Sequence, residues 1–135
     1  MSSDPAELDV DWIHGALSNR AYWALGRSRE VVEASISGSV CIGAYRGSAQ
    51  VGFARVITDG VTFAWLCDVF VDESERGNGI GTRLVEALLD DPRVRDVGRV
   101  ALATTDAASL YERLGFKQLE HPERQMERRS KAGRG

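Results

Sequence analysis

The stretch Asp68–Leu89, DVFVDESERGNGIGTRLVEALL, decides how this chain folds. It begins with apolar residues typical of the end of a buried strand and continues through an acidic turn into a glycine-dense loop. Three glycines, Gly77, Gly79 and Gly81, fall within five residues of that loop. Apolar residues then recur at helical spacing. The stretch therefore predicts a strand that runs through a glycine-rich loop into the first turn of a helix.

This loop suits an anion. The first turn of a helix presents backbone N–H groups without a partner inside the helix, and the helix dipole adds partial positive charge. Glycines let a phosphate approach the backbone, and Arg76 adds a full charge. A tight turn that needs positive φ angles explains the glycines equally well when the loop is taken alone. A Walker A loop and a dinucleotide fingerprint both fit poorly, because no lysine follows the glycines and their spacing is Gly-x-Gly-x-Gly.

Size and composition narrow the class of protein. A chain of 135 residues, 43% of them hydrophobic, predicts a single domain over residues 1–135. A net charge of −3 carries no nucleic-acid signature, and no apolar run is long enough to span a membrane. The polar N-terminus is unlike a signal peptide, so we expect a cytoplasmic protein. Cys41 and Cys67 fall in strand-like runs and are better explained as core residues than as metal ligands, so no metal is expected.

Hydrophobic periodicity and turn residues predict the order of the elements. Expected helices cover residues 11–25, 28–37, 80–90 and 107–114, with Ser28 and Asp106 as N-caps. Asn19 is a candidate break in the first of these helices. Expected strands cover residues 7–10, 40–45, 50–57, 62–71 and 99–103, and a terminal hairpin pairs 116–119 with 125–127. The three strands between residues 40 and 71 predict an antiparallel meander, and the next strand, reached through a helix, should be parallel. Residues 1–7 and 130–135 are expected to be mobile tails.

Two motifs carry a resemblance to a known family. Arg76-x-x-Gly79-x-Gly81 after a Val-x-Val strand resembles the acyl-CoA loop of the GCN5-related N-acetyltransferase (GNAT) superfamily. The downstream stretch 107–116, AASLYERLGF, is similar to the Ala-x-x-Leu-Tyr-x-x-x-Gly-Phe segment of the same family. The resemblance covers about residues 8–128. It implies a mixed α+β domain with a central twisted sheet of about six to seven strands, both antiparallel and parallel, flanked by about four helices.

The resemblance also implies acetyl-CoA as cosubstrate. In the family, the central strand and the strand parallel to it splay apart, and pantetheine pairs with the exposed backbone as an added strand would. The residues implied for that edge are Val69, Phe70 and Val71. Those implied for the diphosphate are Arg76, Gly77, Asn78, Gly79, Ile80, Gly81 and Thr82. Thr104, where many members have asparagine, and Ala107 complete the implied cofactor site. The simpler interpretation of residues 69–71 is that their side chains belong to the core. This is compatible with cofactor binding, because only their backbone is assigned to the ligand.

The implied reaction is direct attack of a primary amine on the thioester. An amine with a pKa of about 10.4 must lose a proton, the thioester oxygen needs a donor and the departing thiolate needs a proton. By resemblance, Tyr111 is the general acid; the alternative is an aromatic residue on a buried helix face. Asp68 is the candidate base or acceptor-orienting carboxylate, and the alternative is a carboxylate that binds backbone N–H groups. Because an unpaired buried charge is costly, we expect Asp68 to be paired or to lie at the open end of the site.

The acceptor is the least defined part of the site. Trp65, Trp23 and Tyr22 are candidates for the acceptor pocket, although each is also explained as a core aromatic. An amino acid, a polyamine, an aminoglycoside and a lysine side chain all remain open as acceptors, and the acyl group could be longer than acetyl. An acyl-CoA sensor or an interaction module of the same fold, without transferase activity, is the alternative function. Dimers are common in the superfamily, so a homodimer is compatible with the resemblance.

Overall fold

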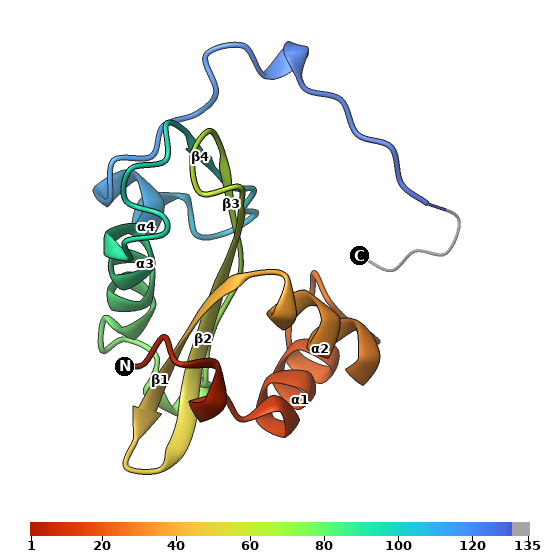
Figure 1. The fold of residues 1–135 in the computed structure, drawn as a ribbon, viewed down its shortest axis with the longest axis vertical. Helices are drawn as coiled ribbons and strands as arrows, with labels where there is room; N and C mark the ends of the chain where they lie inside the picture. Colours follow the sequence, from red (N-terminus) through yellow and green to blue (C-terminus); the bar gives the residue numbers. More distant parts are fainter. Residues whose placement is uncertain (131–135) are drawn as a thin grey trace.

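A computed structural model describes residues 1–130 as a mixed sheet with helices on both faces (Figure 1). The four strands, in the spatial order in which they pair, are β1 (Val40–Arg46), β2 (Ala49–Thr58), β3 (Ala64–Val71) and β4 (Val100–Ala101). The pairs β1–β2 and β2–β3 are antiparallel, and β3–β4 is parallel. The predicted meander, the parallel fourth strand and the α+β class are therefore confirmed.

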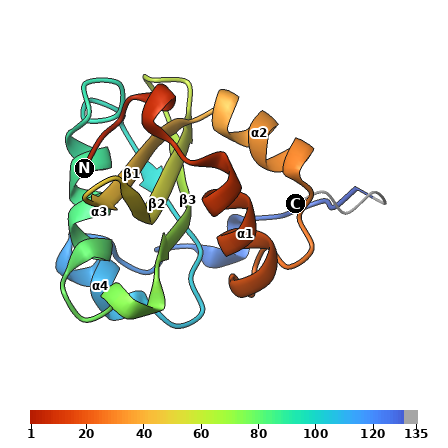
Figure 2. The same cartoon turned by 90° about the horizontal axis from the view of Figure 1, so that it is seen from below.

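The helices form two layers around the sheet, as Figure 2 shows from below. They are α1 (Val10–Arg20), α2 (Arg29–Ser37), α3 (Ile80–Asp90) and α4 (Ala108–Arg113). Helices α3 and α4 lie on one side of the sheet, and α1 and α2 lie on the other. Short 3-10 turns cover Pro5–Glu7 (η1), Glu73–Glu75 (η2) and Pro122–Arg124 (η3). Ser28 caps α2 as predicted, because its hydroxyl accepts a hydrogen bond from the Val31 N–H.

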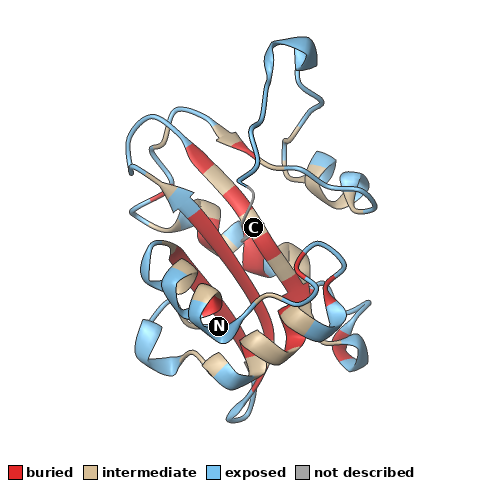
Figure 3. Cartoon of the chain, turned by 90° about the vertical axis from the view of Figure 1, so that its right-hand side faces the viewer, coloured by how far each residue is buried: buried red, intermediate tan, exposed pale blue. Residues whose placement is uncertain are grey.

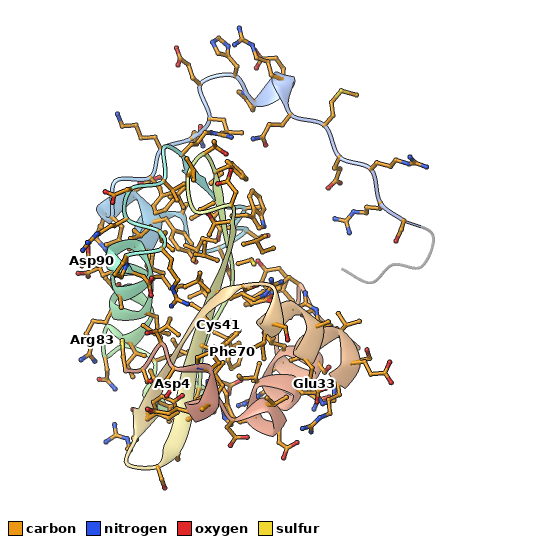
Figure 4. The ribbon with its side chains drawn as sticks, in the orientation of Figure 1. Asp4, Glu33, Cys41, Phe70, Arg83 and Asp90 are labelled. Atoms are coloured by element: carbon orange, nitrogen blue, oxygen red, sulfur yellow. The ribbon has the colours of Figure 1, made fainter. Side chains whose placement is uncertain are left out.

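Each layer has its own apolar core, and the buried positions run along the central strands (Figure 3). Helix α3 packs closely on the sheet because β2 has a glycine beneath it: a Cβ at Gly52 would lie 3.0 Å from Leu84 Cδ1. Leu84 itself is fully buried. On the opposite face, Cys41 and Phe70 belong to the core beneath α1 and α2, and Figure 4 labels both. The sheet is thus covered by side chains on both faces.

The strand count is a correction: four strands are found in the described residues, where six to seven were expected. Residues 7–10 are not a strand, because Asp9 caps α1 by accepting the Trp12 N–H and helical backbone begins at Val10. The terminal hairpin is also wrong within the described residues. Pro122 lacks a backbone donor and opens the turn η3 between its two expected strands.

Two helix boundaries also differ from the prediction. Helix α1 ends at Arg20, next to the candidate break at Asn19, rather than near residue 25. Helix α4 begins at Ala108 without a side-chain cap, so Asp106 does not have the expected capping role. The Thr104 hydroxyl instead accepts the Ala107 N–H at 3.0 Å.

The N-terminal end of the chain, one of the two ends expected to be mobile, contacts the sheet. Near the N-terminus, Ser2 exchanges two backbone hydrogen bonds with Gly43 of β1, and η1 follows. The second expected tail, residues 130–135, lies outside the described residues except for Ser130.

Candidate functional site

The site is built around an irregularity in β3. The β2–β3 register steps from Phe53 opposite Phe70 to Arg55 opposite Cys67, so β3 carries one extra residue. Asp68 lies in this bulge and has a φ of 53°, the only positive φ at a non-glycine position in the described chain. Because side chains alternate along a strand, the extra residue moves the β3 side chains that follow it to the opposite face of the sheet.

The same strand has an open edge. β4 pairs with β3 only at Ala64 and Trp65. From Leu66 to Val71, no described strand pairs with β3 on the side of β4. The splayed strands therefore leave backbone groups of β3 exposed to a cavity, and an extended ligand can pair with such an edge.

A first cavity of about 600 Å³ follows this edge to the start of α3. It is lined by ten of the twelve residues predicted for the cofactor: Val69, Phe70, Val71, Arg76, Gly77, Gly79, Ile80, Gly81, Thr82 and Ala107. The structure does not bring the other two into its lining. Asn78 donates its side-chain amide to the Glu75 carbonyl, and Thr104 lines neighbouring cavities. We call this the cofactor cavity.

The glycine loop ends in an uncapped helix. Gly77 and Gly79 have φ values of 86° and 75°, which L side chains rarely adopt. Gly79 occupies the N-cap position of α3 and no side chain caps the helix, so the amides of its first turn are available to a ligand. Arg76 lies beside them and donates from Nε to the Val71 carbonyl at 3.1 Å. The arrangement is suited to an anion.

Two further arginines that sequence reasoning missed also line the cofactor cavity, Arg20 and Arg113. The guanidinium of Arg20 lies 5.2 Å from the centre of the Phe70 ring, and that of Arg76 lies 5.6 Å from it. Arg20 also pairs with Asp72 at 2.8 Å, which ties α1 to the loop after β3. The cavity thus has more positive charge than Arg76 alone supplies.

A second cavity, of about 500 Å³, lies on the other side of the β3 bulge. The aromatic residues predicted for the acceptor, Tyr22, Trp23 and Trp65, all line it. We call it the acceptor cavity. The two cavities share six lining residues: Tyr22, Trp23, Val69, Asp106, Ala107 and Tyr111. A group held at this shared boundary can be reached from both sides.

Tyr111 lies at that boundary, on α4. Its ring packs edge-on against Phe116 with centroids 5.9 Å apart, and its hydroxyl makes no hydrogen bond within the described residues. Burial raises the pKa of Tyr111, and the nearby carboxylate of Asp106 raises it further. The phenol therefore stays protonated at neutral pH, which a proton donor requires.

Asp68 is paired, as the cost of burying its charge predicts. Its carboxylate accepts three hydrogen bonds: from Trp23 Nε1 at 2.9 Å, and from Arg27 Nη1 and Arg55 Nε at 2.7 Å each. Burial alone would raise the pKa of Asp68, but the charge and hydrogen bond of Arg55, the charge of Arg27 and the hydrogen bond from Trp23 together outweigh burial and lower it. These donors are side chains, not the backbone N–H groups considered from the sequence.

Three more residues of the acceptor cavity were missed from the sequence. Arg55 interrupts the apolar run of β2, which is the same signal that singled out Asp68 in β3. Arg27 lies in the loop before α2, where nothing in the sequence marks it. Asp106 was expected only as a helix cap, yet it is exposed and lines both cavities.

The thiols are poor nucleophiles. Burial raises the pKa of Cys67, which lines the acceptor cavity, to about 11, and that of Cys41 to about 12. Within residues 1–130, no three His, Cys, Asp or Glu side chains gather in a way that could hold a metal ion. No helix in that part of the chain is long and apolar enough to cross a membrane.

Comparison with known proteins places these features in a family. The family description "Acetyltransferase (GNAT) domain" matches residues 37–118. A crystal structure of an inferred GNAT-family acetyltransferase from Xanthomonas campestris is 40% identical, with a TM-score of 0.91, and the match covers 96% of this chain and 91% of that one. Aminoglycoside 6'-acetyltransferase type Ii is 29% identical with a TM-score of 0.69, over 87% of this chain and 80% of that enzyme.

Related protein sequences support the same family. An inferred acetyltransferase of Gibberella zeae, FG08082, is 36% identical over 87% of this chain and 78% of its own length. Further plant and algal relatives match over about half of this chain and over 26% to 40% of their own length. The shared motifs, the splayed sheet and these matches together show that the chain belongs to the GNAT family of acetyltransferases.

Proposed function

We propose that this protein transfers an acetyl group from acetyl-CoA to a primary amine by direct attack of the amine on the thioester. The observation that carries the proposal is the meeting of the two cavities at Tyr111 and Val69. The cofactor cavity supplies an anion-binding helix start and an open strand edge, and the acceptor cavity supplies aromatic walls. A thioester held at the shared boundary is reachable by an amine from the opposite side.

The cofactor residues act mainly through their backbone. The N–H groups at the start of α3 bind the diphosphate, and Arg76 and Arg20 add charge beside it. The open edge of β3 at residues 69–71 pairs with the pantetheine amides. Thr104 and Asn78 do not line the cofactor cavity, so we assign them no direct contact and give Asn78 a role in shaping the loop.

In the chemical step, the amine nitrogen forms a bond to the thioester carbon as the carbon–sulfur bond breaks. A backbone N–H near Val69 stabilises the oxyanion, and Tyr111 gives its proton to the departing CoA sulfur. The protonated thiol of Cys67 makes an acetyl-cysteine intermediate unfavourable, which supports direct transfer over a two-step route. The proton of the amine leaves through Asp106 or through water.

Asp68 is assigned a positioning role rather than the role of base. A base must accept a proton, but both oxygens of this carboxylate already accept hydrogen bonds, and its pKa is lowered. Its contact with Trp23 fixes one wall of the acceptor cavity. Of the two roles considered for Asp68 from the sequence, orientation of the acceptor is the one that the geometry supports.

The test has two readouts. Binding of acetyl-CoA is measured by thermal unfolding, where a ligand at 100 times its dissociation constant adds about 2.7 kcal/mol of stability. Transfer is measured by release of free CoA thiol in the presence of a panel of amines. The transferase predicts both signals. Binding without thiol release would instead support an acyl-CoA sensor, and an absence of binding would support an interaction module.

The remaining expectations stay predictions of the proposal. They are a single domain over residues 1–135, a cytoplasmic location, and no nucleic-acid partner, membrane partner or metal. The oligomeric state stays open, and a homodimer is compatible with the resemblance. Cell fractionation would test the location, and light scattering would test for a dimer.

A further inference from the structure

The acceptor cavity contains an open donor on a buried arginine. We propose, building on the proposed transferase function, that the acceptor amine carries a carboxylate and that Arg55 binds this carboxylate. The acceptor is thus a small amino acid-like molecule with an apolar body rather than a polyamine or an aminoglycoside. Arg55 serves as a specificity-determining residue.

The hydrogen bonds of Arg55 leave one nitrogen for a ligand. Its side chain is only 11% exposed. Nε donates to Asp68 Oδ2 at 2.7 Å, and Nη1 donates to the Ser39 hydroxyl at 3.0 Å. Nη2 has no partner among the described residues, yet every fully buried side-chain nitrogen or oxygen there has one. Nη2 is therefore accessible, and Arg55 lines the acceptor cavity.

The charges around the cavity favour an anion. Within the described part of the chain, its charged lining residues are three arginines and two aspartates: Arg27, Arg55, Arg129, Asp68 and Asp106. Arg129 pairs with Glu127 at 3.5 Å, and Asp106 lies at the boundary with the cofactor cavity. At the buried end, therefore, the guanidiniums of Arg27 and Arg55 both face the single carboxylate of Asp68. Both oxygens of Asp68 are occupied by donors, so this carboxylate offers little to a second ammonium group. At this buried end a second ammonium group would meet repulsion, whereas one carboxylate would bind a guanidinium by a charge-assisted hydrogen bond. The same positive charge favours the neutral form of the attacking amine.

The walls suit an apolar body of modest size. Tyr22 and Trp23 pack edge to face with centroids 4.9 Å apart, and Asp68 fixes the Trp23 indole N–H at 2.9 Å. Trp65 and Ile57 add further apolar surface. With its carboxylate at Arg55, an acceptor in this cavity can direct its amine toward the boundary at Tyr111.

The first experiment uses the wild-type protein and matched acceptors. An apolar α-amino acid, its primary carboxamide and its decarboxylated amine are compared by acetyl-CoA-dependent thiol release, together with spermidine and kanamycin. We expect kcat/KM for the acid to exceed that for the amide by at least about tenfold, since a hydrogen bond to a charged group is lost. Equal or better use of the amide, the decarboxylated amine or either polycation would overturn this inference and leave the transferase intact. Binding of acetyl-CoA with no thiol release from any amine would overturn the transferase itself, and this inference with it.

The second experiment uses Arg55→Met, with the exposed Arg95→Met as the matched control. In Arg55→Met the ratio of acid to amide should fall to near one, mainly through a higher KM for the acid, while the dissociation constant of acetyl-CoA stays unchanged. Arg95→Met should keep the wild-type ratio. A folded Arg55→Met protein that retains the preference for the acid would refute the assignment. If Arg55→Met does not fold, the matched acceptors on the wild-type protein still decide the question.

Discussion

Replacing Asp68 by asparagine tests the central electrostatic feature of the site. The change removes one negative charge from a cluster in which Asp68 is 4% exposed and two buried arginines share its Oδ2. Removing one partner of a buried ion pair costs about 3–5 kcal/mol. Because asparagine keeps the volume and one acceptor oxygen, we expect the lower end, about 3 kcal/mol. That is a large share of the roughly 5–15 kcal/mol by which domains are stable.

The measurement is unfolding by urea and by heat at pH 7, with the exposed Asp96→Asn as control. We expect Asp68→Asn to lower the melting temperature by about 10 °C, and the control to change stability by less than about 0.5 kcal/mol. The folded-state pKa of Asp68 is lowered, so its stabilisation is fully present above the unfolded pKa of about 4 and is lost as the pH falls through the folded pKa. The gap between variant and wild type should therefore narrow in acid.

Two results would refute this reasoning. A variant within about 1 kcal/mol of wild type at pH 7 would mean that the arginines do not depend on Asp68. A gap that stays constant down to the acid limit would mean that the carboxylate is not the titrating group. The pH–rate profile adds an independent test: a positioning role predicts a higher KM for the acceptor with the alkaline rise in place, whereas a flattened rise would restore Asp68 as the base.

Three other substitutions test the remaining parts of the site and the core. Gly79→Glu should abolish acetyl-CoA binding in a calorimetric titration, because it brings a carboxylate to the start of α3. The control Gly79→Asn should retain weaker binding, because asparagine tolerates a positive φ. Equal binding by both variants would show that the loop does not hold the diphosphate. Tyr111→Phe should lower kcat by about 10²-fold or more in stopped-flow thiol release and change acetyl-CoA affinity little; an unchanged kcat would remove Tyr111 as the proton donor. Leu84→Ala should destabilise the fold by about 2–5 kcal/mol in urea titration because Leu84 is fully buried, and a loss below about 1 kcal/mol would contradict the packing of α3 on the sheet.

Local signals predicted much of this fold. The Ser28 cap and the strand–loop–helix around Gly79 each depend on a few neighbouring residues, and the structure has both elements. The expected strand at residues 7–10 failed because the capping carboxylate of Asp9 outweighed a short alternating pattern. The terminal hairpin failed because patterns of three or four residues carry little information without a neighbouring strand to pair with.

Less of the site than of the fold could be predicted from the sequence. Ten of twelve cofactor positions line one cavity because the loop and its helix are contiguous in sequence. The partners of Asp68 were not found, since Arg27 and Trp23 lie 41 and 45 residues away along the chain. Periodicity reports which face a residue occupies, but it does not report which distant side chain shares that face.

The bulge in β3 has a consequence for how this protein can evolve. Before it, Leu66 packs in the core under α3, and after it, Phe70 packs in the core under α1, although four residues would normally return a strand to the same face. The residue that opens the site is thus also the one that distributes side chains between the two cores. Deleting it would close a pocket and would also move every later side chain of the strand to the opposite face of the sheet. Natural variation at this point should therefore preserve strand length strictly while allowing the identity of the surrounding side chains to drift.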